Sequence, residues 1–292
     1  MNDYLLKAID NSQQVRIMLA RTTGLVEEAR RRHHTSPTAS AALGRVLTAA
    51  VMMGSDMKGE KDITTIRING NGPCGPIIAT ADPAGNVRGL ISEPEADVPS
   101  LYPGKLAVGN LVGKDGFLEV SKDLGLQQPF VGKVPLVSGE IGEDIASYYL
   151  NSEQIPALVA VGVLVAPDVT IQAAGGLIIQ ALPGASDEIL ELVESNVLKM
   201  PPISTIINDG TALEESLTEI LKDVPYRVVG QQPLHFKCTC NRERLQAILA
   251  SLSLEELQSI YHKEGKLEVV CNFCREVYTY TLEEIEEKKQ KP

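Results

Sequence analysis

The chain has 292 residues, of which 43% are hydrophobic and 22% charged, and its formal net charge is −11. This is the composition of a globular protein long enough for two domains, and its negative balance argues against broad binding to nucleic acid or to an anionic membrane. Neither a secretory signal nor a bilayer-length apolar run is evident, so we expect a soluble, cytoplasmic protein whose five cysteines are reduced.

Strands and helices alternate over the first 182 residues. The patterns predict strands at 14–19, 63–68, 77–81, 85–91, 156–165 and 169–182, and helices at 25–34, 38–57 and 140–151. Residues 111–120 are expected to form a hairpin around the turn Lys114–Gly116. The sequence therefore predicts an α+β fold, with an N-terminal sheet-and-helix core domain at residues 1–182.

The composition changes after Pro183 and Gly184, where two short helices are expected. Ser186 is expected to cap the first, to about residue 198, and residues 211–214 have the pattern of a capping box that opens the second, to about residue 221. Each helix has one apolar face that must pack on a neighbour. These faces are Ile189, Leu190, Val193 and Val197, and Leu213, Leu217, Ile220 and Leu221. Residues 183–230 are thus predicted to be a helical linker.

The last residues, 231–292, are predicted to form a small third domain. Asn241 is expected to cap a helix to about residue 250, and capping-box patterns at 253–256 and 281–284 indicate two more helices. Two strands are expected, at 267–270 and 276–280. A domain of this size buries little apolar surface, so we expect a further cross-link to stabilise it.

Four cysteines in this domain have the spacing of a metal site. Cys238 and Cys240 are separated by one residue, and Cys271 and Cys274 by two. Two close pairs of thiols in a small reduced domain match the needs of a tetrahedral Zn²⁺ ion. His235 and His262 are possible substitute ligands, but four thiolates already complete the shell. We therefore predict a zinc-binding domain with these four cysteines as ligands.

Zinc alone does not define a function, and the residues leave two interpretations open. Most sites with four cysteines are structural. However, disulfides within each close pair are conceivable, and one between Cys238 and Cys240 would be strained and therefore labile. Oxidation would expel the metal and remove the cross-link of the domain. From the residues alone, the structural interpretation is favoured over a redox switch.

Catalytic motifs are weak or missing. Gly70, Gly72 and Gly75 match the dinucleotide pattern, but prolines and a strand follow them where a helix would be needed, so a hairpin turn is expected. Cys74, in the same turn, is expected to be a plain free thiol. No phosphate loop, serine-hydrolase or zinc-protease motif occurs in the sequence. We expect that the protein is not an enzyme.

With these features together, the chain resembles the redox-regulated 33 kDa heat-shock chaperonins, which are bacterial holdases. The resemblance covers essentially the whole length, through the four-cysteine pattern and the segments 69–73, 137–149 and 173–184. It implies an ATP-independent chaperone that keeps unfolding client proteins soluble under oxidative and heat stress. The reduced, zinc-bound form would be inactive. Oxidation would form the Cys238–Cys240 and Cys271–Cys274 disulfides, release zinc, destabilise the linker and accompany formation of an active homodimer.

Two other classes of function remain to be compared with the holdase. The first is a zinc-ribbon binding module with a structural zinc, but residues 231–292 carry 9 basic and 10 acidic side chains, whereas a nucleic-acid ribbon should be basic. The second is a thiol–disulfide oxidoreductase that uses Cys271 and Cys274. Such motifs usually open a helix, and this one is predicted to lie between two strands.

Overall fold

The computed structural model describes residues 2–100, 102 and 104–290, and the chain divides into two compact units. The N-terminal unit is Met1–Phe236 and the C-terminal unit is Lys237–Pro292. The division into a core at 1–182, a linker at 183–230 and a zinc-binding domain at 231–292 stays a prediction, because compactness does not test what each segment does.

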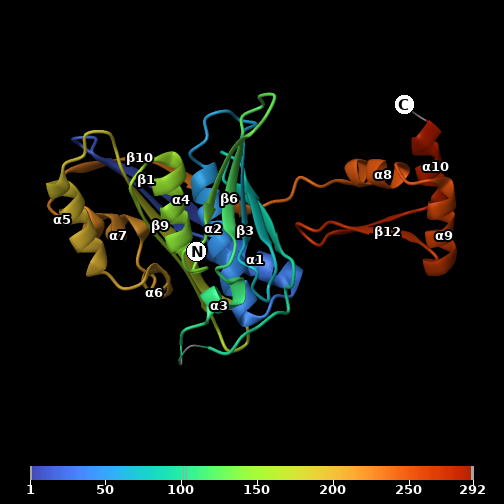
Figure 1. Ribbon diagram of the computed structural model, residues 1–292, viewed down its shortest axis with the longest axis horizontal. Coiled ribbons are helices and arrows are strands. Elements are labelled where there is room, and N and C mark those ends of the chain that lie inside the picture. The colour runs from blue at the N-terminus through green and yellow to red at the C-terminus, as the bar shows by residue number, and fades with distance from the viewer. Residues whose placement is uncertain (1, 101, 103, 291–292) are drawn as a thin grey trace. The chain divides into compact units, whose positions relative to one another are not determined.

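A five-stranded antiparallel sheet forms one layer of the N-terminal unit (Figure 1). Its strands run in the order β10-β1-β2-β9-β8. They are β1 (Tyr4–Asp10), β2 (Val15–Arg21), β8 (Ala157–Val165), β9 (Ile171–Ala181) and β10 (Tyr226–Pro233). Strands distant in sequence are thus neighbours, and β10 places the end of the predicted linker on the first strand of the chain.

A six-stranded sheet forms a second layer, in the order β11-β5-β4-β3-β6-β7. Its strands are β3 (Ile63–Asn69), β4 (Ile77–Ala81), β5 (Asn86–Ile91), β6 (Phe117–Asp123), β7 (Phe130–Pro135) and β11 (His235–Phe236). The pairs are antiparallel except that of β11 with β5, in which His235 lies opposite Asn86 and Phe236 opposite Val87. The chain therefore leaves the N-terminal unit along an edge of this sheet.

Helix α2 (Pro37–Gly54) lies between the two sheets and is buried over almost its whole length. Its small side chains allow close approach on both sides, and Ser36 caps its start by accepting a hydrogen bond from the N–H of Ala39. The other helices of this part are α1 (Thr23–His33), α3 (Val108–Val112), α4 (Gly142–Tyr148) and the π-helix η1 (Tyr149–Glu153). The main apolar core is centred on α2.

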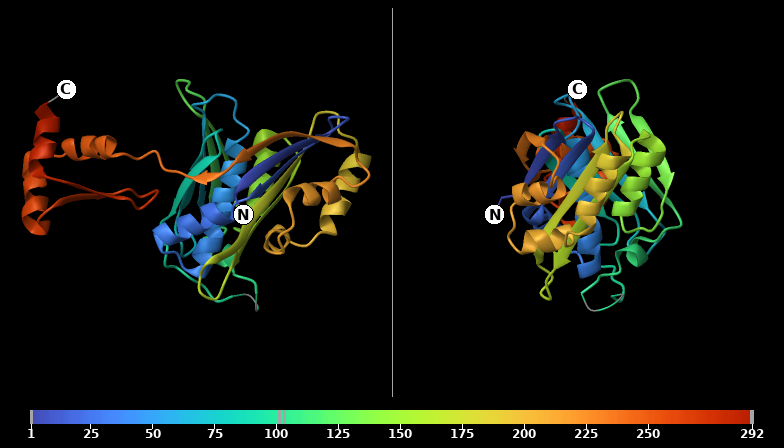
Figure 2. Two further views of the ribbon diagram at one scale, coloured as in Figure 1. Left: turned by 180° about the vertical axis from the view of Figure 1, so that it is seen from behind. Right: turned by 90° about the vertical axis from the view of Figure 1, so that its left-hand side faces the viewer.

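Three helices cover the opposite face of the five-stranded sheet (Figure 2, right). They are α5 (Asp187–Leu198), α6 (Ile203–Asn208) and α7 (Leu213–Ile220). Leu213, Leu217 and Ile220 are fully buried there, in a second apolar cluster that also contains Leu6 and Ile17 of the sheet. We call α5, α6 and α7 the outer layer. Its apolar faces pack on the sheet, as the sequence pattern required.

Two neighbouring glycines of β9 let helices approach the sheet from its two faces. A Cβ added at Gly175 would lie 2.1 Å from Cδ1 of Ile207 in α6, whereas one at Gly176 would lie 2.7 Å from Cε of Met52 in α2. Side chains of adjacent strand residues point to opposite faces. The two glycines thus bring the outer layer and the central helix close to the same strand.

The C-terminal unit contains three helices and a hairpin. They are α8 (Arg242–Ala250), α9 (Leu254–Glu264), β12 (Leu267–Val270), β13 (Val277–Tyr280) and α10 (Leu282–Gln290). The predicted caps form, because Asn241 and Ser253 each accept a hydrogen bond from a backbone N–H three residues later, and Thr281 does the same for Glu284. Helix boundaries in this unit therefore follow the sequence closely.

Several predictions for the N-terminal unit were wrong or incomplete. Residues 111–120 are not a hairpin, because α3 ends at Val112 and the chain turns at Gly113 before β6 begins. Residues 211–214 form no capping box, because Ala212 is the N-cap and the Glu214 carboxylate instead accepts a hydrogen bond from the Tyr4 hydroxyl at 2.9 Å. Ser186 precedes α5 as expected, but its side chain makes no capping hydrogen bond. Strands β1, β7, β10 and β11 and helices α3 and α6 had not been expected.

No helix among the described residues is long and apolar enough to cross a membrane.

Candidate metal centre

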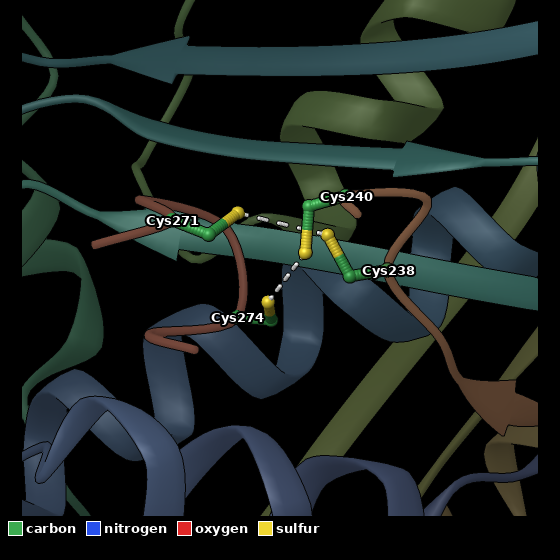
Figure 3. Close-up of side chains that lie close together, drawn as sticks. All are labelled: Cys238, Cys240, Cys271 and Cys274. Atoms are coloured by element: carbon green, nitrogen blue, oxygen red, sulfur yellow. Dashed lines mark hydrogen bonds between the residues drawn. The ribbon is translucent and has the colours of Figure 1, made fainter. Parts of the chain in front are cut away.

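Four cysteine side chains of the C-terminal unit converge on one point (Figure 3). The Sγ atoms of Cys238, Cys240, Cys271 and Cys274 all lie within 4.8 Å of one another. The sulfurs of Cys238 and Cys271 are 3.8 Å apart, and those of Cys240 and Cys274 are 3.3 Å apart. We call these four side chains the cysteine cluster.

The dimensions of the cluster suit a tetrahedral metal ion. With metal–sulfur bonds of about 2.3 Å, a tetrahedral zinc site has sulfur–sulfur edges of about 3.8 Å. Of the two separations given above, one equals this value and the other is 0.5 Å shorter, and all five cysteines of the chain are thiols in the structure. The cluster can therefore hold a metal ion, and a set of four thiolates is typical of zinc.

The two pairs come from different kinds of local structure. Cys238 and Cys240 lie on an extended segment before α8, where alternate side chains point the same way. Cys271 and Cys274 lie in the turn between β12 and β13, which is closed by a hydrogen bond from the Cys271 N–H to the Glu276 carbonyl at 2.9 Å. The members of each pair are close in sequence, so one long-range approach, of the extended segment to the turn, brings all four sulfurs together.

Burial differs between the pairs. The side chains of Cys271 and Cys274 are buried, whereas Cys238 and Cys240 are half-buried. The metal site would thus have one protected side and one side open to small solutes such as peroxide. Cys238 and Cys240 are therefore the more accessible pair of the cluster.

The pKa values of Cys238, Cys240 and Cys274 shift in different directions. Burial opposes ionisation of Cys238, but hydrogen bonds from the Cys240 backbone and from the neighbouring sulfurs outweigh it and lower the pKa. Burial raises the pKa of Cys240 and Cys274, and in Cys274 the hydrogen bonds with neighbouring thiols raise it further. Four close thiols cannot all carry charge without a cation between them, so metal binding would release protons.

A fifth side chain reaches the cluster, and sequence reasoning missed it. The Tyr278 hydroxyl lies 3.4 Å from Sγ of Cys240, and this hydrogen bond raises the pKa of Tyr278. Tyr278 is two residues before the buried Tyr280 on β13, so the alternation of a strand could have placed both tyrosines on one face. Nothing in the sequence pairs residue 278 with residue 240.

The other candidate residues lie outside the cluster. The histidines His235 and His262 are exposed, on β11 and α9, and are not members of the four-residue group. The glycine pattern at 70–75 forms the turn between β3 and β4, as expected, and no helix follows it. Cys74 is fully buried in that turn, and burial raises its pKa to about 11, which makes it an unreactive thiol at neutral pH.

Comparison with known proteins assigns the chain to a family. The model of the Hsp33 protein family matches residues 3–281. The 33 kDa chaperonin of Geobacillus kaustophilus is 49% identical over 290 residues, with 99% of this chain and 98% of that protein covered. The 33 kDa chaperonin of Desulforamulus reducens is 46% identical over 286 residues, covering 98% and 97%.

A solved structure is also similar over the whole length. The crystal structure of the 33 kDa chaperonin (heat shock protein 33 homolog) from Thermotoga maritima superposes with a TM-score of 0.92 at 36% sequence identity, covering 99% of this chain and 98% of that one. The match confirms the predicted α+β fold, and the resemblance noted in the sequence is correct. The chain belongs to the Hsp33 protein family.

Proposed function

We propose that the protein is an ATP-independent holdase, controlled by the redox state of the cysteine cluster. It binds unfolding client proteins, prevents their aggregation under oxidative and heat stress, and acts in the cytoplasm. The observation that carries this proposal is the convergence of four thiols in a unit with little apolar core of its own. Family membership supports the chaperone activity, and the cluster supports its control.

The reduced protein would bind one Zn²⁺ through Cys238, Cys240, Cys271 and Cys274. When bound, the metal would cross-link the extended segment to the hairpin and hold the four sulfurs as thiolates. The side chains of this unit that are buried besides the cysteines are few: Leu245, Leu249, Leu257, Leu267, Tyr280 and Ile285. Because so small a core gives little stability, the fold of this unit would depend on the metal.

Oxidation would convert the ligand set into two disulfides, Cys238–Cys240 and Cys271–Cys274. For each disulfide, two thiolates give two electrons to one peroxide molecule, whose O–O bond breaks, and two protons complete two water molecules. Sulfur would be oxidised and peroxide reduced, and the four cysteines would no longer supply thiolate ligands for a metal. The sulfur distances alone do not favour this pairing, which rests on the resemblance to the family.

The outer layer is the proposed source of surface for clients. Its buried apolar faces would bind unfolded segments if the layer left the sheet. The outer layer is joined to the cysteine cluster by β10, an edge strand, and by the two-residue strand β11. Loss of structure after Phe236 would free β11, which pairs with β5 through two residues only, and would so loosen the outer layer through β10, an order-to-disorder switch.

Partners and alternatives follow from the same features. Active protein is proposed to form a homodimer, with clients as its other partners and neither nucleic acid nor a membrane among them.

A thiol–disulfide oxidoreductase gains no support from the site, because Cys271 and Cys274 lie in a hairpin turn and not at a helix N-terminus. The remaining alternative is a binding module whose zinc is purely structural.

The decisive experiment is light scattering of a heat-unfolding client without ATP. The protein would be added either reduced with zinc or oxidised by peroxide at elevated temperature. We expect suppression of aggregation by the oxidised form only, with release of one equivalent of zinc. Equal suppression by both forms would leave a chaperone with a structural zinc, and no suppression by either would favour the zinc-ribbon module.

Hydrogen exchange tests the proposed role of the outer layer. Amides of residues 186–221 should be protected in the reduced, zinc-bound protein and should exchange faster after oxidation. Equal protection in the two states would contradict the coupling between the cysteine cluster and the outer layer. It would leave the holdase activity itself to the scattering experiment.

A further inference from the structure

The Tyr278 hydroxyl connects the two chain segments that carry the cysteine cluster. Tyr278 lies on β13, opposite Val269 of β12, in the same hairpin as Cys271 and Cys274. Its oxygen is 3.4 Å from Sγ of Cys240, which belongs to the extended segment before α8. The contact therefore spans 38 residues of sequence and links the hairpin to the other pair of ligands.

The metal determines which atom donates in this contact. A cysteine that ligates a metal has lost its proton, so its sulfur can only accept a hydrogen bond. The tyrosine hydroxyl is then the donor, and its half-buried position limits competition from water. A phenylalanine at this position would keep the ring and lose the donor.

We propose that Tyr278 donates a hydrogen bond to the metal-bound thiolate of Cys240, and thereby positions that sulfur and slows its oxidation. The inference rests on the proposed function and adds a residue outside the ligand set that adjusts the response to oxidant. An O–H···S bond withdraws electron density from the sulfur lone pair. The thiolate becomes a weaker nucleophile, while its orientation toward the metal is fixed.

The step that would be slowed is attack of the Cys240 sulfur on peroxide. The sulfur takes one oxygen as the O–O bond breaks, which gives a sulfenic acid and hydroxide. A neighbouring thiolate, that of Cys238 in the proposed pairing, then displaces hydroxide from the sulfenic acid to form the disulfide. Donation by Tyr278 opposes the first of these two steps, because it stabilises the lone pair that attacks.

The test uses full-length Tyr278→Phe with Tyr261→Phe as the matched control. Tyr261 is an exposed tyrosine of α9 in the same unit, so its substitution removes a hydroxyl elsewhere. Loaded with Co²⁺, the Tyr278→Phe protein should show a sulfur-to-metal charge-transfer band at lower energy, with tetrahedral ligand-field bands retained. Its Zn²⁺ affinity, measured by competition with a chromophoric chelator, should fall about tenfold. Zinc release by peroxide should be several-fold faster at equal metal loading.

The outcomes separate this inference from the proposed function. If the unaltered protein bound no Co²⁺, the proposed metal site would itself fail. If it bound Co²⁺ but Tyr278→Phe matched Tyr261→Phe in band energy and in zinc affinity, only the role of Tyr278 would be overturned. If Tyr278→Phe did not fold, 3-fluorotyrosine placed at position 278 would decide. This stronger donor should move the band to higher energy, and an unchanged energy would refute the proposal.

Discussion

The two units of the chain differ in what holds them together. The N-terminal unit contains two large apolar clusters, one on each face of the five-stranded sheet. The C-terminal unit is built from three short helices and one hairpin, and its most concentrated feature is a group of four thiols. Apolar burial stabilises a fold in proportion to the area removed from water. The first unit can therefore be stabilised by packing alone, whereas the second is proposed to depend on a metal held by its four sulfurs.

Under the proposed function, this difference would let one chain respond to oxidant without losing its whole structure. Among the five cysteines, oxidation would act on the cysteine cluster, since the fifth thiol, Cys74, is buried and its raised pKa makes it unreactive. The two sheets of the N-terminal unit, which contain none of the four cluster cysteines, would then remain folded. The outer layer is held by packing on one face of the five-stranded sheet. We therefore expect its stability to lie between that of the two sheets and that of the C-terminal unit. Each prediction below changes one of these three regions.

The largest expected effect is on the C-terminal unit, when the proposed metal is removed. Apparent binding free energies of structural zinc are about 10–16 kcal/mol, more than so small a core supplies. Cys271→Ser, or a chelator added to the reduced protein, should abolish amide protection in α8 and α9 while the thermal transition of the N-terminal unit persists. Hydrogen exchange and calorimetry measure the two effects.

Cys74→Ser is the matched control for this loss. It removes a buried thiol of the N-terminal unit, so zinc content and protection of α8 and α9 should stay as in the unaltered protein. Retained protection in Cys271→Ser would show that the C-terminal unit folds without metal, and the contrast between the units would disappear.

A smaller effect is expected when the packing of the outer layer is weakened. Leu217 is 1% exposed and faces the sheet, so Leu217→Ala should lower the free energy of unfolding by about 2–5 kcal/mol. Leu198→Ala removes the same atoms from a side chain that is 76% exposed and should change it little. Urea unfolding of the two variants gives the comparison. Similar values for both would mean that the outer layer adds nothing to stability.

The two glycines of β9 provide a finer comparison between the layers. In Gly175→Ala the new Cβ would meet Ile207 of α6 and, at 2.4 Å, the backbone carbonyl of Ala20, which cannot move aside. In Gly176→Ala it would meet the side chains of Met52 and Thr48 from α2. Each change should cost about 1–3 kcal/mol by overpacking.

Hydrogen exchange should show which helix packs against each glycine. Gly175→Ala should raise exchange in α6, and Gly176→Ala in α2. Gly230→Ala, where no atom lies within 4 Å of the new Cβ, should leave both layers unchanged. If the two β9 variants loosened the same helix, the assignment of one glycine to each face would be wrong.

The sequence revealed the cysteine cluster because its ligands come as two local pairs, and each pair can be recognised without knowing the fold. Strand β1, by contrast, has no local pattern by which it could be recognised. Leu5 packs in the core around α2, whereas Leu6 packs under the outer layer. A strand buried on both faces loses the alternation by which strands are recognised. The contact between Tyr278 and Cys240 is long-range and has no local pattern at all.

Local sequence patterns also gave wrong predictions where a residue distant in sequence formed a hydrogen bond with a group that the pattern requires. The carboxylate of Glu214 has the spacing of a capping box, yet Tyr4 of β1 binds it, and the box does not form. In the expected hairpin at 111–120, Leu111 and Val112 instead end the short helix α3, which packs against α2, and only the second strand forms, as the start of β6. Tertiary contacts thus override local propensity most often in the unit with the larger core, whereas the caps of the C-terminal unit form as predicted.

The smallest expected effect separates two serines with the same apparent role. Ser253 accepts a hydrogen bond from the N–H of Glu256 at 3.2 Å and begins α9, whereas Ser186 begins α5 without a capping bond from its side chain. Ser253→Ala should therefore weaken α9 by about 1 kcal/mol, seen as roughly fivefold faster exchange of its amides, and Ser186→Ala should leave α5 unchanged. Equal effects would mean that the bond at Ser253 contributes nothing. Such a result would weaken the case that the C-terminal unit, with few buried side chains, relies on local hydrogen bonds more than the N-terminal unit does.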